Sequence, residues 1–210
     1  MSKNLKRHPP SRNTAKKILI ACEGSKTEPD YFESIRQDLR LRTLQIIVLR
    51  HQGKTDPRSI IERVIEERQK MKLNQRWTEG DTAWAVFDGD EHIEKSLDHW
   101  CGAINRAKSQ KIQLAITNPS FELWYLIHFR DQFSQINRHQ AIALLKEYIP
   151  NYDKSKCFYP KPLKPLTSEA IKRGEKMAGQ IQRAGLDEYS NPSCNGLPNL
   201  IRLLLNLEKS

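Results

Sequence analysis

Short apolar runs alternate with longer amphipathic runs along the first half of the chain. The apolar runs predict buried strands near residues 17–22, 44–50, 82–87 and 112–117, and the amphipathic runs predict helices near 28–40, 57–73 and 93–108. Such alternation is typical of an α/β fold, in which right-handed crossovers build a mostly parallel, Rossmann-like sheet with helices on both faces. Thr27-Glu28-Pro29 and Asp56-Pro57 supply the N-cap and first-turn signals of the first two helices.

The pattern changes after Thr117, where no further strand is predicted. Helices are expected near 121–129, 138–148, 167–184 and 195–207, with a loop rich in Pro, Tyr and Lys over 150–165. We therefore expect three parts: a disordered basic arm over 1–16, an α/β core over 17–130, and a helical extension packed on the core over 131–210. The loop is long for a compact domain. It either holds a nucleic-acid strand by charge and stacking, or is a surface loop anchored by its aromatic rings.

Two acidic clusters stand where predicted strands end. The run 18–22 leads into Glu23 and Gly24, and the run 82–87 leads into Asp88-Gly89-Asp90. Because the carboxyl ends of parallel strands meet at one edge, neighbouring strands would bring these three carboxylates together. Carboxylates that converge repel one another unless a cation lies between them, and oxygen ligands suit Mg2+. Each cluster also has a simpler interpretation, since Glu23 could cap the next helix and Asp-Gly pairs are ordinary turn formers.

Composition and charge narrow the class of partner. The 210 residues carry a formal net charge of +10, which favours polyanions, chiefly nucleic acid. The four cysteines are scattered without zinc-finger or disulfide spacing, so a reducing cytosol is the expected setting. No apolar stretch is long enough to span a bilayer. We expect a soluble, cytoplasmic protein without a membrane partner.

Longer strings add a family resemblance. They are ILIACEGSKTEPDYF at 18–32, HQGKTDPRSII at 51–61, WAVFDGDEH at 84–92, TNPSFELWYLIHF at 117–129 and NPSCNGLPNLI at 191–201. Together they resemble the RloB family, a Toprim-like group related to OLD-type nucleases and encoded near bacterial restriction and defence genes. The resemblance implies that Glu23, Asp88 and Asp90 take the metal and acid-base positions: Glu23 is a general acid or base, and all three carboxylates are candidate ligands of Mg2+ or Mn2+.

The string at 117–129 places polar residues in an apolar helix. Asn118 and Glu122 are four apart and share one face, which makes Asn118 a candidate substrate contact. Glu122 either faces the acidic edge as a metal or water ligand, or is a structural carboxylate satisfied by a neighbour. His128 is expected to be a packed or capping histidine.

Basic residues near the strand ends are candidates for binding a phosphate. Lys26 stands at the mouth of the first helix, and His51 and Lys54 follow the second strand. With the carboxylates they predict a Mg2+-dependent nuclease that hydrolyses DNA or RNA, including tRNA. The chain has no nucleotide-hydrolysing motif, so any ATP use in defence would need an ATPase partner protein. The alternative is a non-catalytic nucleic-acid-binding or regulatory subunit; a homodimer remains open.

Overall fold

The computed structural model describes residues 16–40, 45–49 and 56–207. The sheet consists of β1 (Lys17–Cys22), β2 (Gln45–Leu49), β3 (Thr82–Asp88) and β4 (Gln113–Thr117), in the order β2-β1-β3-β4 with every pair parallel. The helices are α1 (Thr27–Leu39), α2 (Pro57–Leu73), α3 (Asp90–Lys95), α4 (Leu97–Ser109), α5 (Glu122–Leu126), α6 (Arg138–Tyr148), α7 (Thr167–Arg183) and α8 (Leu197–Asn206), with a 3-10 turn at Lys164–Leu166. The predicted α/β fold with a mostly parallel sheet is confirmed.

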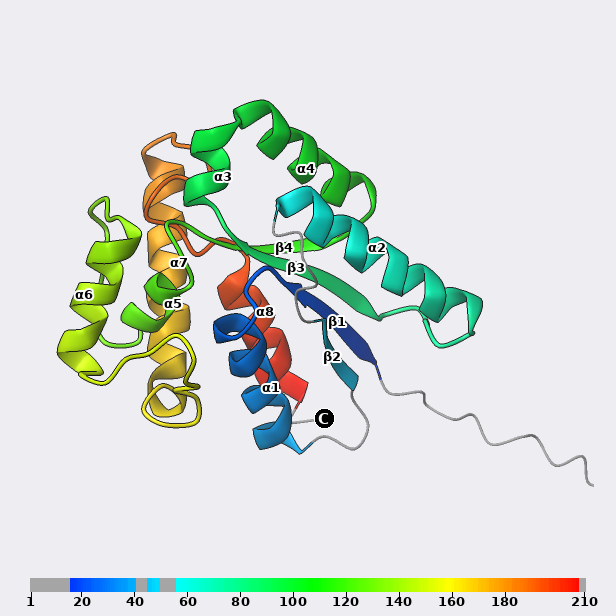
Figure 1. Cartoon of the computed structure of the whole chain (residues 1–210), viewed down its shortest axis with the longest axis horizontal. Coiled ribbons are helices and arrows are strands. Elements are labelled where there is room, and N and C mark those ends of the chain that lie inside the picture. Colours follow the sequence, from blue (N-terminus) through cyan, green and yellow to red (C-terminus); the bar gives the residue numbers. More distant parts are fainter. Residues whose placement is uncertain (1–15, 41–44, 50–55, 208–210) are drawn as a thin grey trace, which may run out of the picture.

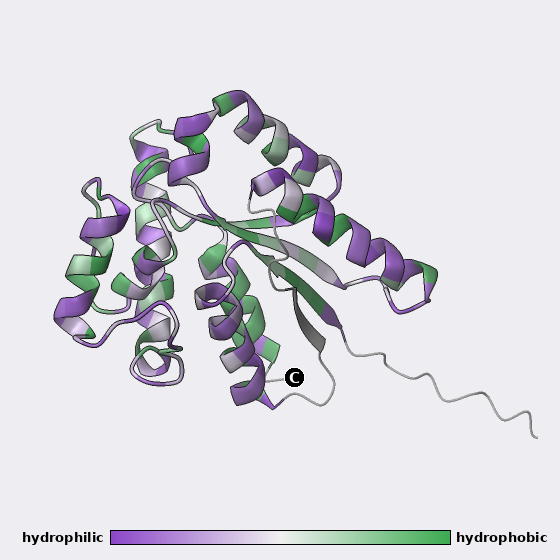
Figure 2. Ribbon diagram, viewed as in Figure 1, coloured by the Kyte–Doolittle hydropathy of each residue, from purple (hydrophilic) through white to green (hydrophobic). Residues whose placement is uncertain are grey.

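Helices cover both faces of the sheet (Figure 1), because alternate residues of each strand point to opposite sides. Leu19 and Ala21 of β1 join a cluster with residues of α2 and α4, whereas Ile18 and Ile20 join a larger cluster with α1, α5 and α8. Every residue of β1 is buried, and β1 and β4 are largely apolar in the hydropathy view (Figure 2). The sheet is therefore buried on both sides, as a parallel sheet requires.

The C-terminal helices share the larger cluster with the sheet. It includes Leu145 of α6, Ala170 of α7 and Leu204 of α8. The predicted boundary at residue 130 falls between α5 and α6, and Figure 1 places α5, α6 and α7 side by side at one end of the sheet. The expected basic arm lies outside the described residues, except for Lys16.

Residues 193–196 attach α8 to the edge of β4. The Ile116 N–H donates to the Asn195 carbonyl at 2.8 Å, and Asn118 and Ser193 form an antiparallel bridge. Gly196 has φ +77°, and a Cβ at this position would lie 1.9 Å from the Leu114 carbonyl oxygen. Only glycine fits there.

Three helix predictions differ from the structure. The helix predicted over 93–108 is two helices, because Ser96 is extended (φ −167°, ψ 106°) and caps α4 by accepting from the His99 N–H at 3.4 Å. Thr27 is the first residue of α1 and not its cap, and its hydroxyl donates to the Lys154 carbonyl at 3.1 Å. The helix predicted over 121–129 is shorter, at Glu122–Leu126. Asp56 does cap α2, accepting from the Ser59 N–H at 3.0 Å.

Candidate functional site

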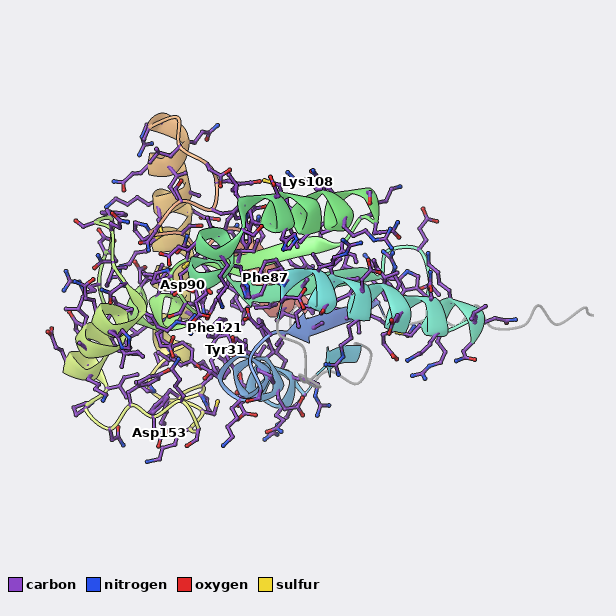
Figure 3. The ribbon with its side chains drawn as sticks, turned by 45° about the horizontal axis from the view of Figure 1, so that its top comes forward. Tyr31, Phe87, Asp90, Lys108, Phe121 and Asp153 are labelled. Carbon is purple, nitrogen blue, oxygen red and sulfur yellow. The ribbon has the colours of Figure 1, made fainter. Side chains whose placement is uncertain are left out.

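An open cavity of about 460 Å3 lies at the carboxyl ends of β1 and β3. Segments far apart in the chain line it, and Figure 3 labels two of the lining residues, Phe121 and Asp153. Four of its acidic side chains are here called the acidic cluster: Glu23, Glu28, Asp88 and Glu122; Glu91 and Asp153 also line it. Three basic side chains, here called the basic rim, also line it: Lys26, Arg138 and Lys154. The cavity thus offers oxygen ligands for a cation beside positive charges for an anion.

Glu23 is fixed at both carboxylate oxygens. The parallel ladder continues one residue past β1, since the Glu23 N–H donates to the Val86 carbonyl at 2.9 Å. Its Oε2 accepts the Asp88 N–H at 2.9 Å, and its Oε1 lies 2.9 Å from His92 Nε2. Residues 65 positions apart are therefore joined, because β1 and β3 are neighbours and end at the same edge. His92, which sequence reasoning missed, lies one turn into the helix that follows Asp88.

Asp88 and Asp90 share a guanidinium. Arg138 Nη2 lies 2.9 Å from Asp90 Oδ1 and 3.4 Å from Asp88 Oδ2, while Nη1 lies 3.5 Å from Glu91 Oε1. The Thr117 hydroxyl donates to Asp88 Oδ1 at 2.8 Å. No sequence signal pointed to Arg138, which stands 50 residues after Asp88 and does not belong to the predicted sheet.

Burial and charge crowding act on Asp88. Burial raises its pKa well above the usual value, and the carboxylates of Glu28 and Glu23 raise it further. The hydroxyl of Thr117 and the guanidinium of Arg138 act in the opposite direction without offsetting the rise. Burial and the neighbouring carboxylates therefore both disfavour the charged form of Asp88.

Glu28 is a member of the acidic cluster that sequence reasoning treated as a first-turn helix residue. Glu28 is 6% exposed, and burial, with the charges of Glu122 and Glu23, raises its pKa to about 7. A Cβ at Gly24 would lie 1.9 Å from Glu28 Oε2, so the glycine after Glu23 leaves the space that this carboxylate fills. The available signal was the pair of glutamates on either side of that glycine turn.

Glu122 is buried and fully engaged. It accepts from the Ser120 hydroxyl at 2.6 Å and from the Tyr152 hydroxyl at 2.9 Å, and it pairs with Lys154 Nζ at 2.9 Å. Burial alone would raise the pKa of Glu122, but these donors outweigh it and lower that pKa. The carboxylate thus lines the cavity, as one interpretation expected, and is satisfied by neighbours, as the other expected.

Of the other predicted site residues, only some are described, and not all of those line the cavity. Lys26 lines the cavity, but Asn118 does not: its Nδ2 donates to the Tyr189 carbonyl at 2.8 Å, and its backbone holds Ser193. His51 and Lys54 lie outside the described residues. His128 is packed, with its Nδ1–H donating to the Trp124 carbonyl at 2.8 Å.

The oxygen donors of the acidic cluster are of the kind that a hard divalent cation prefers. The side chains of this cluster offer only carboxylate oxygens, and the pKa of Asp88 is raised by burial and by the charges of Glu28 and Glu23, which a cation would offset. As the side chains stand, no group of three or more His, Cys, Asp or Glu within 16–40, 45–49 and 56–207 is arranged to hold a metal ion. Arg138, and not a neighbouring acid, is the group that faces both Asp88 and Asp90.

Comparisons with known proteins give one match. A family model described as RloB-like protein matches residues 18–204. No curated protein and no solved structure matches the chain. Within the described residues, no helix is both long and apolar enough to cross a membrane. The family match covers nearly the whole sheet and all the helices that line the cavity, so the chain belongs to the RloB-like family.

Proposed function

We propose that the protein is a Toprim-like nuclease that hydrolyses phosphodiester bonds of DNA or RNA with the help of Mg2+ or Mn2+. The observation that carries the proposal is the meeting of Glu23 and Asp88 at one sheet edge, in a cavity that also contains the basic rim. A phosphodiester is an anion whose hydrolysis needs both charge stabilisation and an activated water. The basic rim offers charges that can stabilise the phosphate, and the acidic cluster offers carboxylates that can hold the cation that activates a water.

The proposal assigns a role to each group of residues, and Glu23 has two. Asp88, Asp90, Glu23 and Glu28 would hold the cation, which supplies an activated water and offsets charge on the leaving oxygen. The basic rim binds and orients the phosphate, because its charges line the same cavity as the carboxylates. Glu23 is the proposed general acid or base, since the Asp88 N–H and His92 hold both of its oxygens in fixed positions.

The family membership supports a wider setting. We place the activity in bacterial anti-phage or restriction-linked defence, with an ATPase partner protein that supplies any nucleotide hydrolysis. The net charge of +10 supports a polyanionic substrate, with tRNA among the candidates.

One observation favours the alternative of a non-catalytic subunit that binds nucleic acid. Arg138 already pairs with Asp88 and Asp90, so the acidic edge is held together without a metal ion. In such a protein the carboxylates would be structural, and the basic surface alone would contact the nucleic acid.

Cleavage assays with site variants distinguish the two functions. Purified protein is incubated with labelled DNA and RNA, including tRNA, in Mg2+ or Mn2+. Glu23→Ala and Asp88→Ala should abolish cleavage, whereas Glu62→Ala should not. Glu62 is a matched control because it pairs with Arg106 at 2.8 Å on α2 and α4 and does not line the cavity.

Each outcome favours one function. Cleavage that survives both site substitutions contradicts the nuclease. A wild-type protein that binds these nucleic acids and cuts none of them, even with its ATPase partner added, supports the non-catalytic subunit.

A further inference from the structure

Arg138 lies where a cation would be needed. It is the first residue of α6, and its guanidinium faces Asp88, Asp90 and Glu91 at 3.4, 2.9 and 3.5 Å. The side chains of Asp88 and Asp90 are 15% and 18% exposed, so water screens them only in part. Arg138 therefore supplies much of the positive charge that keeps the two aspartates together.

The backbone that carries Arg138 is held firmly. Asn137 caps α6 in a capping box with Gln140. The Asn191 side chain accepts the Ile136 N–H at 3.0 Å and donates to the Ile136 carbonyl at 2.7 Å. A movement of the guanidinium must therefore come from rotation of the side chain and not from displacement of the helix.

The side chain has room to rotate. Arg138 lines the central cavity, and it also lines a second cavity of about 500 Å3 together with Asn137, Gln140 and Asn191. Its side chain is 30% exposed, and its buried Nε has no hydrogen-bond partner among the described residues. The ion pairs with the aspartates are thus the main contacts that fix the guanidinium.

We propose that Arg138 is an internal counter-ion that a divalent cation displaces, and that the released guanidinium then pairs with the phosphate of the nucleic-acid substrate. This inference rests on the proposed function and assigns a role to a residue outside the predicted site. A guanidinium and a metal ion are both positive and repel each other at the same aspartates, so they compete. Once released, the forked donors of arginine match the oxygens of a phosphate in the same cavity.

Titration calorimetry with Mn2+ tests the competition between the Arg138 guanidinium and the divalent cation. Arg138→Met should bind Mn2+ about tenfold more tightly than wild type, the equivalent of one charge-assisted hydrogen bond. It should also melt at a lower temperature without metal, and saturating Mn2+ should remove most of that difference. Arg106→Met is the matched control, because it removes the same charge from a pair outside the cavity and should leave Mn2+ affinity unchanged. Arg138→Lys keeps the charge without the fork, should bind Mn2+ with intermediate affinity, and serves if the Met variant does not fold.

Fluorescence anisotropy with a labelled phosphorothioate single-stranded oligonucleotide tests the second part of the proposal, that the released guanidinium pairs with phosphate. Arg138→Met should weaken binding several-fold in Mn2+ but change it little without metal, when the guanidinium is engaged by the aspartates. An equal loss of oligonucleotide affinity with and without Mn2+ overturns this part of the proposal, because it would mean that Arg138 contacts phosphate without being released from the aspartates.

The outcomes separate this inference from the proposed function. If Mn2+ binds wild type and Arg138→Met equally, the inference fails and the metal-dependent nuclease stands. If Mn2+ binds neither protein, both fail. A Met variant that is destabilised to the same extent with and without Mn2+ shows a merely structural arginine and also overturns the inference.

Discussion

The hydrogen bond from Tyr152 to Glu122 can be removed without disturbing the packing around it. The Glu122 carboxylate is 2% exposed and accepts the Tyr152 hydroxyl at 2.9 Å. Tyr152→Phe deletes that hydroxyl but keeps the ring, which packs against Tyr125 and Phe158. A hydrogen bond to a buried charged group contributes about 1.5–3 kcal/mol. We expect the variant to lose about 2 kcal/mol of unfolding free energy, which lowers Tm by about 4–8 °C in a domain of this size.

Urea unfolding followed by tryptophan fluorescence measures this loss. Tyr148→Phe is the matched control, because Tyr148 is 40% exposed and its ring stacks on Phe129 through its face and not through its hydroxyl. The control should stay within about 0.5 kcal/mol of wild type. A loss below about 0.5 kcal/mol for Tyr152→Phe, with an unchanged m value, would refute the reasoning.

A double-mutant cycle that combines Tyr152→Phe with Glu122→Gln measures the interaction energy between these two side chains. If the two side chains interact as described, the losses are not additive, and the coupling is about 0.5–3 kcal/mol. The same variant also distinguishes the two roles left open for Glu122. A metal ligand predicts that Mn2+ raises the Tm of wild type but not of Glu122→Gln, whereas a carboxylate held only by its donors predicts the same rise in both.

Three further outcomes are expected. Gly196→Ala should destabilise the fold by more than about 3 kcal/mol or prevent folding, because the added Cβ would overlap the Leu114 carbonyl. Gly185→Ala is the control: Gly185 has φ +64° and nothing lies within 4 Å of an added Cβ, so the variant should lose only the backbone strain of about 1–2 kcal/mol. Equal losses of unfolding free energy for the two variants in urea melts would contradict this prediction. Burial lowers the pKa of His128 to about 4, so at this residue the unfolded state binds more protons below pH 6.5, and the contribution of His128 to stability falls as pH decreases from 6.5 toward 4. Between pH 7 and 5 this loss is about 2 kcal/mol, and it should vanish from the pH profile of His128→Phe; an unchanged profile would exclude His128 as the cause. If the basic rim makes three phosphate contacts, single-strand affinity should fall about 20-fold between 50 and 200 mM salt, and a salt-independent affinity would argue against an electrostatic site.

The part of the site that follows from sheet topology was predictable from the sequence. Alternation of strands and helices implies a parallel sheet, and a parallel sheet brings residues at the carboxyl ends of neighbouring strands together. Glu23 directly follows β1 and Asp88 is the last residue of β3, so their meeting needed only that β1 and β3 be neighbours. Asn118 also follows a strand, but β4 lies at the edge, and the polypeptide at 193–195 occupies the space beside it.

Other site residues depend on side-chain packing that no periodicity encodes. Glu28 has the position of an ordinary first-turn acid, and its place in the cavity depends on the space left by Gly24. Arg138 reaches Asp90 only because the chain after α5 folds back over the carboxyl edge of the sheet, a long-range contact between segments with no pattern in common.

Most of the acidic and basic groups of the site come from different parts of the chain, and this origin constrains how the site can work. The acidic cluster belongs to the α/β segment before residue 130, whereas Arg138 and Lys154 of the basic rim lie beyond it. Lys154 Nζ neutralises Glu122 at 2.9 Å, and Arg138 neutralises Asp88 and Asp90. Without the later segment these partly buried carboxylates would face one another unpaired, which costs several kcal/mol per uncompensated charge. The helices after residue 130 are therefore part of the electrostatic balance of the acidic edge. A metal ion or a phosphate that enters the cavity must redistribute ion pairs between the two segments.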